Sequence, residues 1–381
     1  MKIPALFVLC SLLPLLLNAQ LLPGFTSSGS FDEQQMLVEV SPANTRILIN
    51  APLEGFGKND QVLLILYALP NGNTIEQTFG QKLKDSADWH VNIQHIGAQT
   101  RFLRKLIKDQ TIVVAYLEAG QLSWPLWKQN TPNYLQETKA MVDHIAALFS
   151  PWNPQLVLNG HSGGGRFIFS YLEAAGRIPD KVKRIAFLDS TYGYEDTIHG
   201  PLLVDWLNTG GDNFLCTLAY NDSVVIYNNK ALVSPRGGTW YRSKLMKQYL
   251  ARSFHFREED RDSLLWFTTP ERRIEFILKT NPGKRIYHTQ QVDRNGFIHS
   301  ILSGTTQEQK EYAYFGERVY TSYISDSVII PNSTNLFLNH DPSYKKNPAA
   351  ATPAWPGEYN VLTKAGIDSH KNHELQHLER L

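Results

Sequence analysis

The chain has almost no cysteine: its 381 residues include only Cys10 and Cys216. Cys10 lies in an N-terminal apolar run that we expect to be removed. Cys216 would then be the only cysteine, which excludes an intramolecular disulfide and any cysteine-based metal site. If the protein is exported, the lack of disulfides suits a bacterial envelope or secreted enzyme better than a small extracellular module.

The sequence also lacks an excess of charge. Lys and Arg number 37 against 36 Asp and Glu, a formal net charge of +1, and no run of basic residues occurs. This balance gives no reason to expect a nucleic-acid partner. Hydrophobic residues make up 42% of the chain and charged residues 19%, which allows one large core or two smaller ones.

Long apolar runs are absent except at the start of the chain. Lys2 is followed by an almost wholly apolar run over residues 3–17, and Ala19 precedes Gln20. The run is shorter than the roughly 20 residues of a membrane-spanning helix. We therefore predict a signal peptide over residues 1–19, with the mature protein periplasmic or secreted and not stably inserted in a membrane. The alternatives are a membrane anchor and lipidation at Cys10.

In the rest of the chain, apolar residues form two kinds of pattern: short continuous runs and helical spacing. Short apolar runs predict strands, two of them a hairpin near the N-terminus, and segments with helical spacing lie between the later runs. Alternating strands and helices predict an α/β fold, with a mostly parallel central sheet covered by helices on both faces. The expected strands are 37–40, 46–49, 62–67, 111–117, 155–158, 184–188, 215–220 and 285–290, and the expected helices are 94–108, 134–149, 163–175 and one after His299.

Three segments do not fit this alternation. Residues 20–35 suggest a leader before a main domain that spans residues 36–330. Residues 225–282 are long, aromatic and charged, and we expect a mostly helical insertion there that forms a cap or lid. Residues 331–381 are rich in Pro, Asn and Ala, and we expect a C-terminal extension that wraps over the domain.

One motif points to chemistry. Gly160-His161-Ser162-Gly163-Gly164 follows an expected strand and precedes an expected helix. With Gly160, Ser162 and Gly164 the sequence resembles the α/β-hydrolase superfamily, in which such a turn presents a nucleophilic serine. Small neighbours are needed because strand and helix backbones approach closely there. The alternative is a glycine-rich anion-binding turn.

The resemblance implies a histidine base that follows the serine and a carboxylate between them. His299 lies just after the last expected strand, where the superfamily places its base, and His288 is the rival. Asp222 follows the expected strand 215–220 and is our candidate acid. Asp189 is the alternative, one strand earlier.

The same resemblance implies an oxyanion hole. The amide of Gly163 is one expected donor, because it lies at the start of a helix. The second donor is expected from the loop after strand 62–67, at Leu69 or at Asn71 and Gly72. An ordinary turn is the alternative there, because Asn-Gly is a strong turn pair.

Other candidates are less specific. Trp124 and Trp127 suit either a sugar or aromatic ligand or the anchoring of a loop. His370, His373 and His377 have helical spacing, which permits a zinc site but suits a solvated helix better. We infer no cofactor.

The sequence therefore predicts a serine hydrolase that cleaves a carboxylic ester through Ser162, His299 and Asp222, acting on a small-molecule, carbohydrate-derived or peptide-derived ester. A peptidase or amidase with the same residues is the first alternative, because the triad does not select the leaving group. A catalytically silent relative that binds a ligand is the second.

Overall fold

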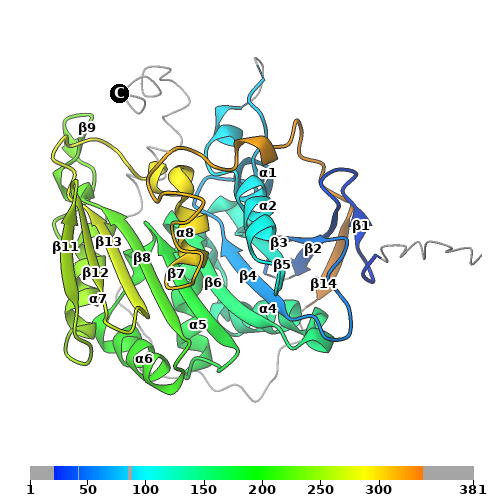
Figure 1. Ribbon diagram of the computed structural model, residues 1–381, viewed down its shortest axis with the longest axis horizontal. Helices are drawn as coiled ribbons and strands as arrows, with labels where there is room; N and C mark the ends of the chain where they lie inside the picture. Colours follow the sequence, from blue (N-terminus) through cyan, green and yellow to red (C-terminus); the bar gives the residue numbers. More distant parts are fainter. Residues whose placement is uncertain (1–20, 42, 85–87, 338–381) are drawn as a thin grey trace, which may run out of the picture.

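The computed structural model describes residues 21–41, 43–84 and 88–337. Within these residues a 12-stranded sheet forms the centre of the molecule, with helices on both faces (Figure 1). No helix in the described part is long and apolar enough to cross a membrane. The predicted signal peptide and the three C-terminal histidines lie outside the described residues.

The strands follow the order β1-β2-β3-β5-β4-β6-β7-β8-β13-β12-β11, and β14 pairs with β2. The six strands from β5 to β13 in this order are parallel. The N-terminal strands and β11 and β12 extend the two sides of the sheet in antiparallel fashion. Their bounds are β1 Thr26–Ser27, β2 Glu33–Ser41, β3 Thr45–Pro52, β4 Val62–Ala68, β5 Thr111–Glu118, β6 Gln155–His161, β7 Val182–Leu188, β8 Phe214–Tyr220, β11 Arg257–Arg261, β12 Leu264–Thr268, β13 Ile274–Lys279 and β14 Ser333–Phe337, with a separate pair β9 Ile226–Tyr227 and β10 Lys230–Ala231.

The helices divide between the two faces and build two hydrophobic cores. Helices α3 to α7 contribute to one core, and α1, α2 and α8 contribute to the other, where they lie together in Figure 1. Central strands such as β4 and β5 are buried along their whole length, which explains their continuous apolar sequences. The helix bounds are α1 Ile75–Phe79, α2 Ile96–Leu106, α3 Trp124–Asn130, α4 Tyr134–Leu148, α5 Gly165–Ala175, α6 Asp196–Thr209, α7 Thr239–Leu250 and α8 Phe297–Leu302.

This architecture confirms the predicted α/β-hydrolase fold. The strands expected at 62–67, 111–117, 155–158, 184–188 and 215–220 are β4, β5, β6, β7 and β8, and the expected N-terminal hairpin is β2 and β3. The expected helices at 94–108, 134–149 and 163–175 are α2, α4 and α5. Parallel strands alternate with helices as the sequence pattern requires.

Two predictions about the second half of the chain are wrong. Residues 225–282 contain one long helix, α7, and the strands β11, β12 and β13, so they are not a mostly helical insertion. Residues 285–290 form no strand, because β13 occupies the place beside β8. The last parallel strand of the sheet therefore ends at Lys279, earlier in the chain than the sequence suggests.

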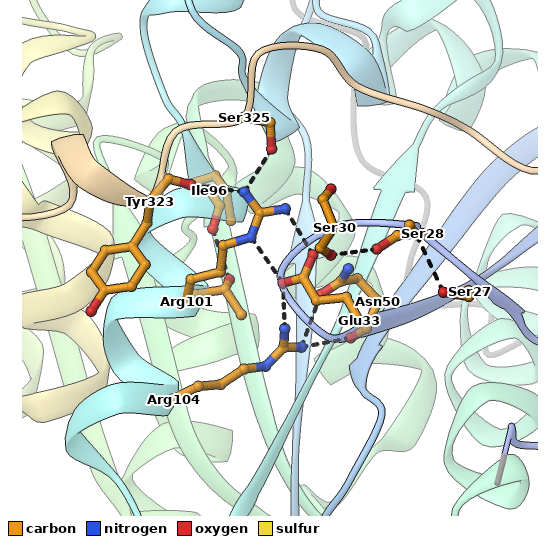
Figure 2. A network of polar contacts seen from close by, with 12 residues as sticks. Ser27, Ser28, Ser30, Glu33, Asn50, Ile96, Arg101, Arg104, Tyr323 and Ser325 are labelled. Atoms are coloured by element: carbon orange, nitrogen blue, oxygen red, sulfur yellow. Dashed lines mark hydrogen bonds and ion pairs between the residues drawn. The ribbon is translucent and has the colours of Figure 1, made fainter. Parts of the chain in front are cut away.

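The two ends of the described chain meet at the same side of the sheet. Strand β2 already begins at Glu33, so the expected leader over 20–35 overlaps the sheet, and β14 of the expected C-terminal extension pairs with β2. In Figure 2, Arg101 and Arg104 of α2 converge on the carboxylate of Glu33, with one N–O distance of 2.7 Å for each arginine. Arg101 also donates to the hydroxyl of Ser325, at 2.7 Å. This buried network joins β2, α2 and the C-terminal segment.

Candidate active site

The predicted nucleophile lies on a sharp turn between β6 and α5. Ser162 follows the last residue of β6 and has a φ of +52°, a left-handed conformation that is rare for residues other than glycine. A methyl group on Gly164 would collide with the carbonyl oxygen of Ala68, and one on Gly165 with that of Ser190. The glycines are therefore required because three backbone segments meet at the turn. This is the strained strand-to-helix geometry that the motif predicts.

A histidine–carboxylate pair lies beside this turn. Nδ1 of His288, in the loop after β13, is hydrogen-bonded to Oδ2 of Asp189. Asp189 directly follows β7, is fully buried and has a φ of +48°. Because the carboxylate engages Nδ1, the orientation leaves Nε2 of His288 as the nitrogen available to a proton.

His161 holds His288 next to the turn. The Nε2 atom of His161 lies 3.0 Å from the backbone oxygen of His288, and the two ring centroids are 4.8 Å apart. Burial, and then the charge of His288, lower the pKa of His161 well below its usual value. His161 is therefore neutral, and its Nε2–H donates to the His288 carbonyl. Because His161 directly precedes Ser162, this bond fixes the backbone of His288 beside the candidate nucleophile.

The structure does not place His299 in this site, and the prediction that it is the base is wrong. His299 lies on α8 and is fully buried. Its Nε2 atom is 2.9 Å from Oε2 of Glu275, and its Nδ1 atom is 3.0 Å from the hydroxyl of Tyr312. Both ring nitrogens are thus engaged by other partners, and neither is free to accept a proton from a serine.

Asp222 is not paired with His299 either, so the predicted contact between these two residues is wrong. Asp222 is 1% exposed, and its Oδ2 atom accepts a hydrogen bond of 2.7 Å from the amide of Thr239. The Thr239 hydroxyl donates to Oδ1 of Asp189. Burial, and then the negative charge of Asp189, raise the pKa of Asp222 to about 7. The structure therefore brings Asp222 close to the alternative acid rather than to the predicted base.

The predicted oxyanion loop is only partly suited to its role. The amide of Leu69 donates to the oxygen of Leu117 at 3.0 Å, and the amide of Gly72 donates to the oxygen of Leu122 at 2.8 Å. These two amides are occupied, so their assignment as donors is wrong. Asn71 differs, because its side chain lies against Gly163: a methyl group on that glycine would collide with the Asn71 amide.

The orientation of the Asn71 side chain is also defined. Its Oδ1 atom accepts a hydrogen bond of 3.2 Å from the amide of Trp124. With the oxygen held there, Nδ2 is the end of the side chain left to donate. Asn71 and Gly163, from separate elements, thus bring donor groups together next to Ser162.

The two tryptophans anchor this loop. Trp124 is 1% exposed, its indole N–H donates to the oxygen of Leu69 at 3.0 Å, and its ring centroid lies 4.7 Å from that of Phe167. Trp127 is also buried. These contacts favour the anchoring interpretation over ligand stacking, since the indole faces are already covered by protein. In the described ranges no group of three or more His, Cys, Asp or Glu side chains is arranged to hold a metal ion.

Comparison with known proteins finds likeness only at the level of structure. No family model and no curated protein sequence matches the chain. Among solved structures, a thermostable esterase matches with 10% identity and a TM-score of 0.39, over 68% of this chain and 56% of its own, so the match spans little more than half of that esterase. A mutant of the feruloyl esterase module from Clostridium thermocellum, complexed with sinapinate, matches with 9% identity and a TM-score of 0.44, over 74% and 90%. A putative carboxylesterase from Lactobacillus plantarum matches with 12% identity and a TM-score of 0.31, over 66% and 86%.

The sequence pattern favours His299 and Asp222 over His288 and Asp189 for identifiable reasons. His288 lies inside the segment 285–290, whose pattern predicts a strand, and Asp189 lies one strand before the usual position of the acid. A signal that favours Asp189 is its place directly after the buried strand β7, the strand next to the one that bears the nucleophile. His288 follows β13, and the charged residues Glu275 and Lys279 within that strand obscure its apolar pattern in the sequence.

Proposed function

We propose that the protein is a serine hydrolase that cleaves a carboxylic ester through an acyl-enzyme, with Ser162 as nucleophile, His288 as base and Asp189 as the orienting acid. The observation that carries this proposal is the hydrogen-bonded pair of His288 and Asp189 beside a strained serine turn. The three residues follow the β6, β13 and β7 strands of one parallel sheet, at its carboxyl edge, where ligands bind in such folds.

The arrangement supports a two-step reaction. His288 Nε2 takes the proton from the Ser162 hydroxyl as its oxygen attacks the ester carbonyl, and Asp189 stabilises the imidazolium that forms. His288 then gives the proton to the departing alcohol. Water then attacks the acyl-enzyme: His288 removes a proton from the water as its oxygen attacks the carbonyl, and His288 returns that proton to the Ser162 oxygen as the carboxylic acid is released.

The oxyanion of each tetrahedral intermediate needs donors that are already in place. We assign the amide of Gly163 and the side-chain amide of Asn71 to this role. Gly163 belongs to the short turn Ser162–Gly164 that leads into α5, so the positive end of the helix also favours the negative charge. The anchoring of Asn71 by the Trp124 amide supports the assignment, because a donor fixed before the reaction costs no reorganisation during it.

The substrate proposed from the sequence is a small-molecule, carbohydrate-derived or peptide-derived ester. The N-terminal residues 1–19 support the further proposal that the protein is exported to the periplasm or secreted. Both rest on the sequence.

Covalent labelling tests the nucleophile. A fluorophosphonate probe should label the purified protein, and Ser162→Ala should abolish the labelling. Ser223→Ala is the matched control, because Ser223 is an exposed serine in the loop after β8 and should leave the labelling intact. Labelling that persists in Ser162→Ala, or is lost only in the control, contradicts the proposed function.

A further inference from the structure

Two buried carboxylates meet behind His288. Asp189 is fully buried and Asp222 is 1% exposed, and both contact Thr239 at the start of α7. The Thr239 hydroxyl donates to Oδ1 of Asp189 and lies 3.4 Å from Oδ2 of Asp222. A hydroxyl has one proton to donate, so it satisfies one of the two carboxylates at a time.

Within the described residues, Asp222 has one carboxyl oxygen without a hydrogen bond, whereas both carboxyl oxygens of Asp189 are hydrogen-bonded. The amide of Thr239 donates to the Oδ2 atom of Asp222 and the backbone amide of Trp240 also favours its ionised form, but the Oδ1 atom of Asp222 is buried and lacks a hydrogen bond in the described part of the chain. A methyl group on Gly238 would collide with this carboxyl group, so the group is closely enclosed. A buried carboxylate with an unpaired oxygen is costly when it is ionised, and less so when it is neutral.

In the described part of the chain, titratable groups from four elements lie around Asp222 and the residues beside it. They are Asp189 after β7, Tyr192 of η5 (Thr191–Gly193), Tyr220 at the end of β8 and His288 in the loop after β13. His288 is the only basic group among them, and Asp189 already engages it through Nδ1. Burial and the charge of Asp189 both raise the pKa of Asp222, as expected where two carboxylates share one site.

Building on the proposed function, we propose that Asp222 is a positioning residue that holds a proton behind the triad, so that Asp189 and Asp222 together present one negative charge to His288. Asp189 carries the charge and orients the imidazole. Asp222 acts through Thr239 and Asp189, not on the substrate. The pair resembles other carboxylate pairs in which one proton is shared because two adjacent charges repel.

This arrangement has a consequence for pH dependence. When Asp222 loses its proton, a second negative charge appears near His288 and favours the protonated imidazole, which cannot act as a base. Asp222→Asn keeps the shape of the neutral acid and removes this second charge. The acidic limb of the pH profile of kcat/KM should then move to lower pH, by on the order of one unit.

The experiment compares the pH profiles of ester hydrolysis by the wild type, Asp222→Asn and Asp212→Asn. Asp212 is a matched control, because it lies before the opposite end of β8 and forms an exposed ion pair with Lys183. We expect a shifted acidic limb in Asp222→Asn and an unchanged profile in Asp212→Asn. A purely structural role would lower activity at every pH without moving the limb, and that outcome overturns the proposal.

The double variant gives an independent test. In Asp189→Asn the repulsion between the two carboxylates disappears, so Asp222 ionises more readily and supplies a negative charge near His288. The loss of kcat should be smaller than the roughly 10⁴-fold loss caused by removing a sole triad carboxylate. Asp189→Asn combined with Asp222→Asn should show the full loss. Equal losses in the single and double variants contradict the shared charge.

Wild-type protein allows a test that needs no substitution. In a ¹³C NMR titration of aspartate carboxyl carbons, one aspartate should titrate near neutrality, and complete ionisation of all aspartates below pH about 5 overturns the proposal. This readout does not depend on catalysis. If Ser162→Ala retains fluorophosphonate labelling, the proposed function fails, while the titration still decides whether the carboxylates share a proton.

Discussion

Replacing the two rival histidines separates catalysis from stability. His288→Ala removes the imidazole whose Nδ1 is bound to Asp189, and with it the group that accepts the serine proton. Loss of a triad histidine lowers kcat by roughly 10⁴- to 10⁶-fold. His299→Ala removes a ring that contacts Glu275 and Tyr312 instead, so kcat/KM of the folded enzyme should stay within about tenfold of wild type.

The cost of His299→Ala should appear as lost stability. His299 is fully buried and Glu275 is 3% exposed, so the substitution leaves a buried carboxylate without its imidazole partner. Removing one member of a buried pair costs about 3–5 kcal/mol. We expect the lower end, because the hydroxyl of Ser303 still donates to Glu275 at 2.6 Å.

The assay is hydrolysis of a chromogenic short-chain ester, combined with urea unfolding of each variant. His299→Gln is a useful control, because it retains a donor in the same cavity and should recover part of the free energy of unfolding while leaving kcat/KM unchanged. The reasoning is refuted if His299→Ala abolishes turnover in folded protein while His288→Ala retains most of it.

Three further substitutions test other parts of the structure. Asn71→Ala should lower kcat by about 10²-fold with little change in KM, as expected for loss of one oxyanion donor; steady-state kinetics measure this, and a change in KM alone would argue against that role. Glu33→Gln should lower the free energy of unfolding by about 3 kcal/mol, because it leaves the buried guanidinium of Arg101 without its carboxylate; urea denaturation measures it, and wild-type stability would show that the network contributes little. Gly165→Ala should lower the free energy of unfolding by about 3 kcal/mol or more, since the added methyl group collides with the Ser190 carbonyl oxygen. Thermal unfolding measures this change, and an unchanged midpoint would show that the turn can accommodate a methyl group.

The sequence by itself determined the sheet, most of its strands and the position of the nucleophile turn. These features depend on local patterns: continuous apolar runs for buried strands, helical spacing for the helices, and small residues around Ser162. Gly160, Ser162 and Gly164 lie close together in the chain, so their spacing alone predicts the turn. The segment 225–282 is the exception, because its strand β11 is charged and exposed along its whole length and its strand β12 is only partly buried, so neither shows the pattern of a buried strand.

Only the tertiary structure decided which histidine and which aspartate meet. His288 and Asp189 are 99 residues apart, and their contact depends on the order of the strands in the sheet. Once β13 pairs with β8, the loop that reaches the turn is the one with His288, and α8 carries His299 into the core beside Glu275. The same packing brings Asp222 and Asp189 to one threonine. No local spacing encodes these contacts, because they arise from elements that become neighbours only when the sheet forms.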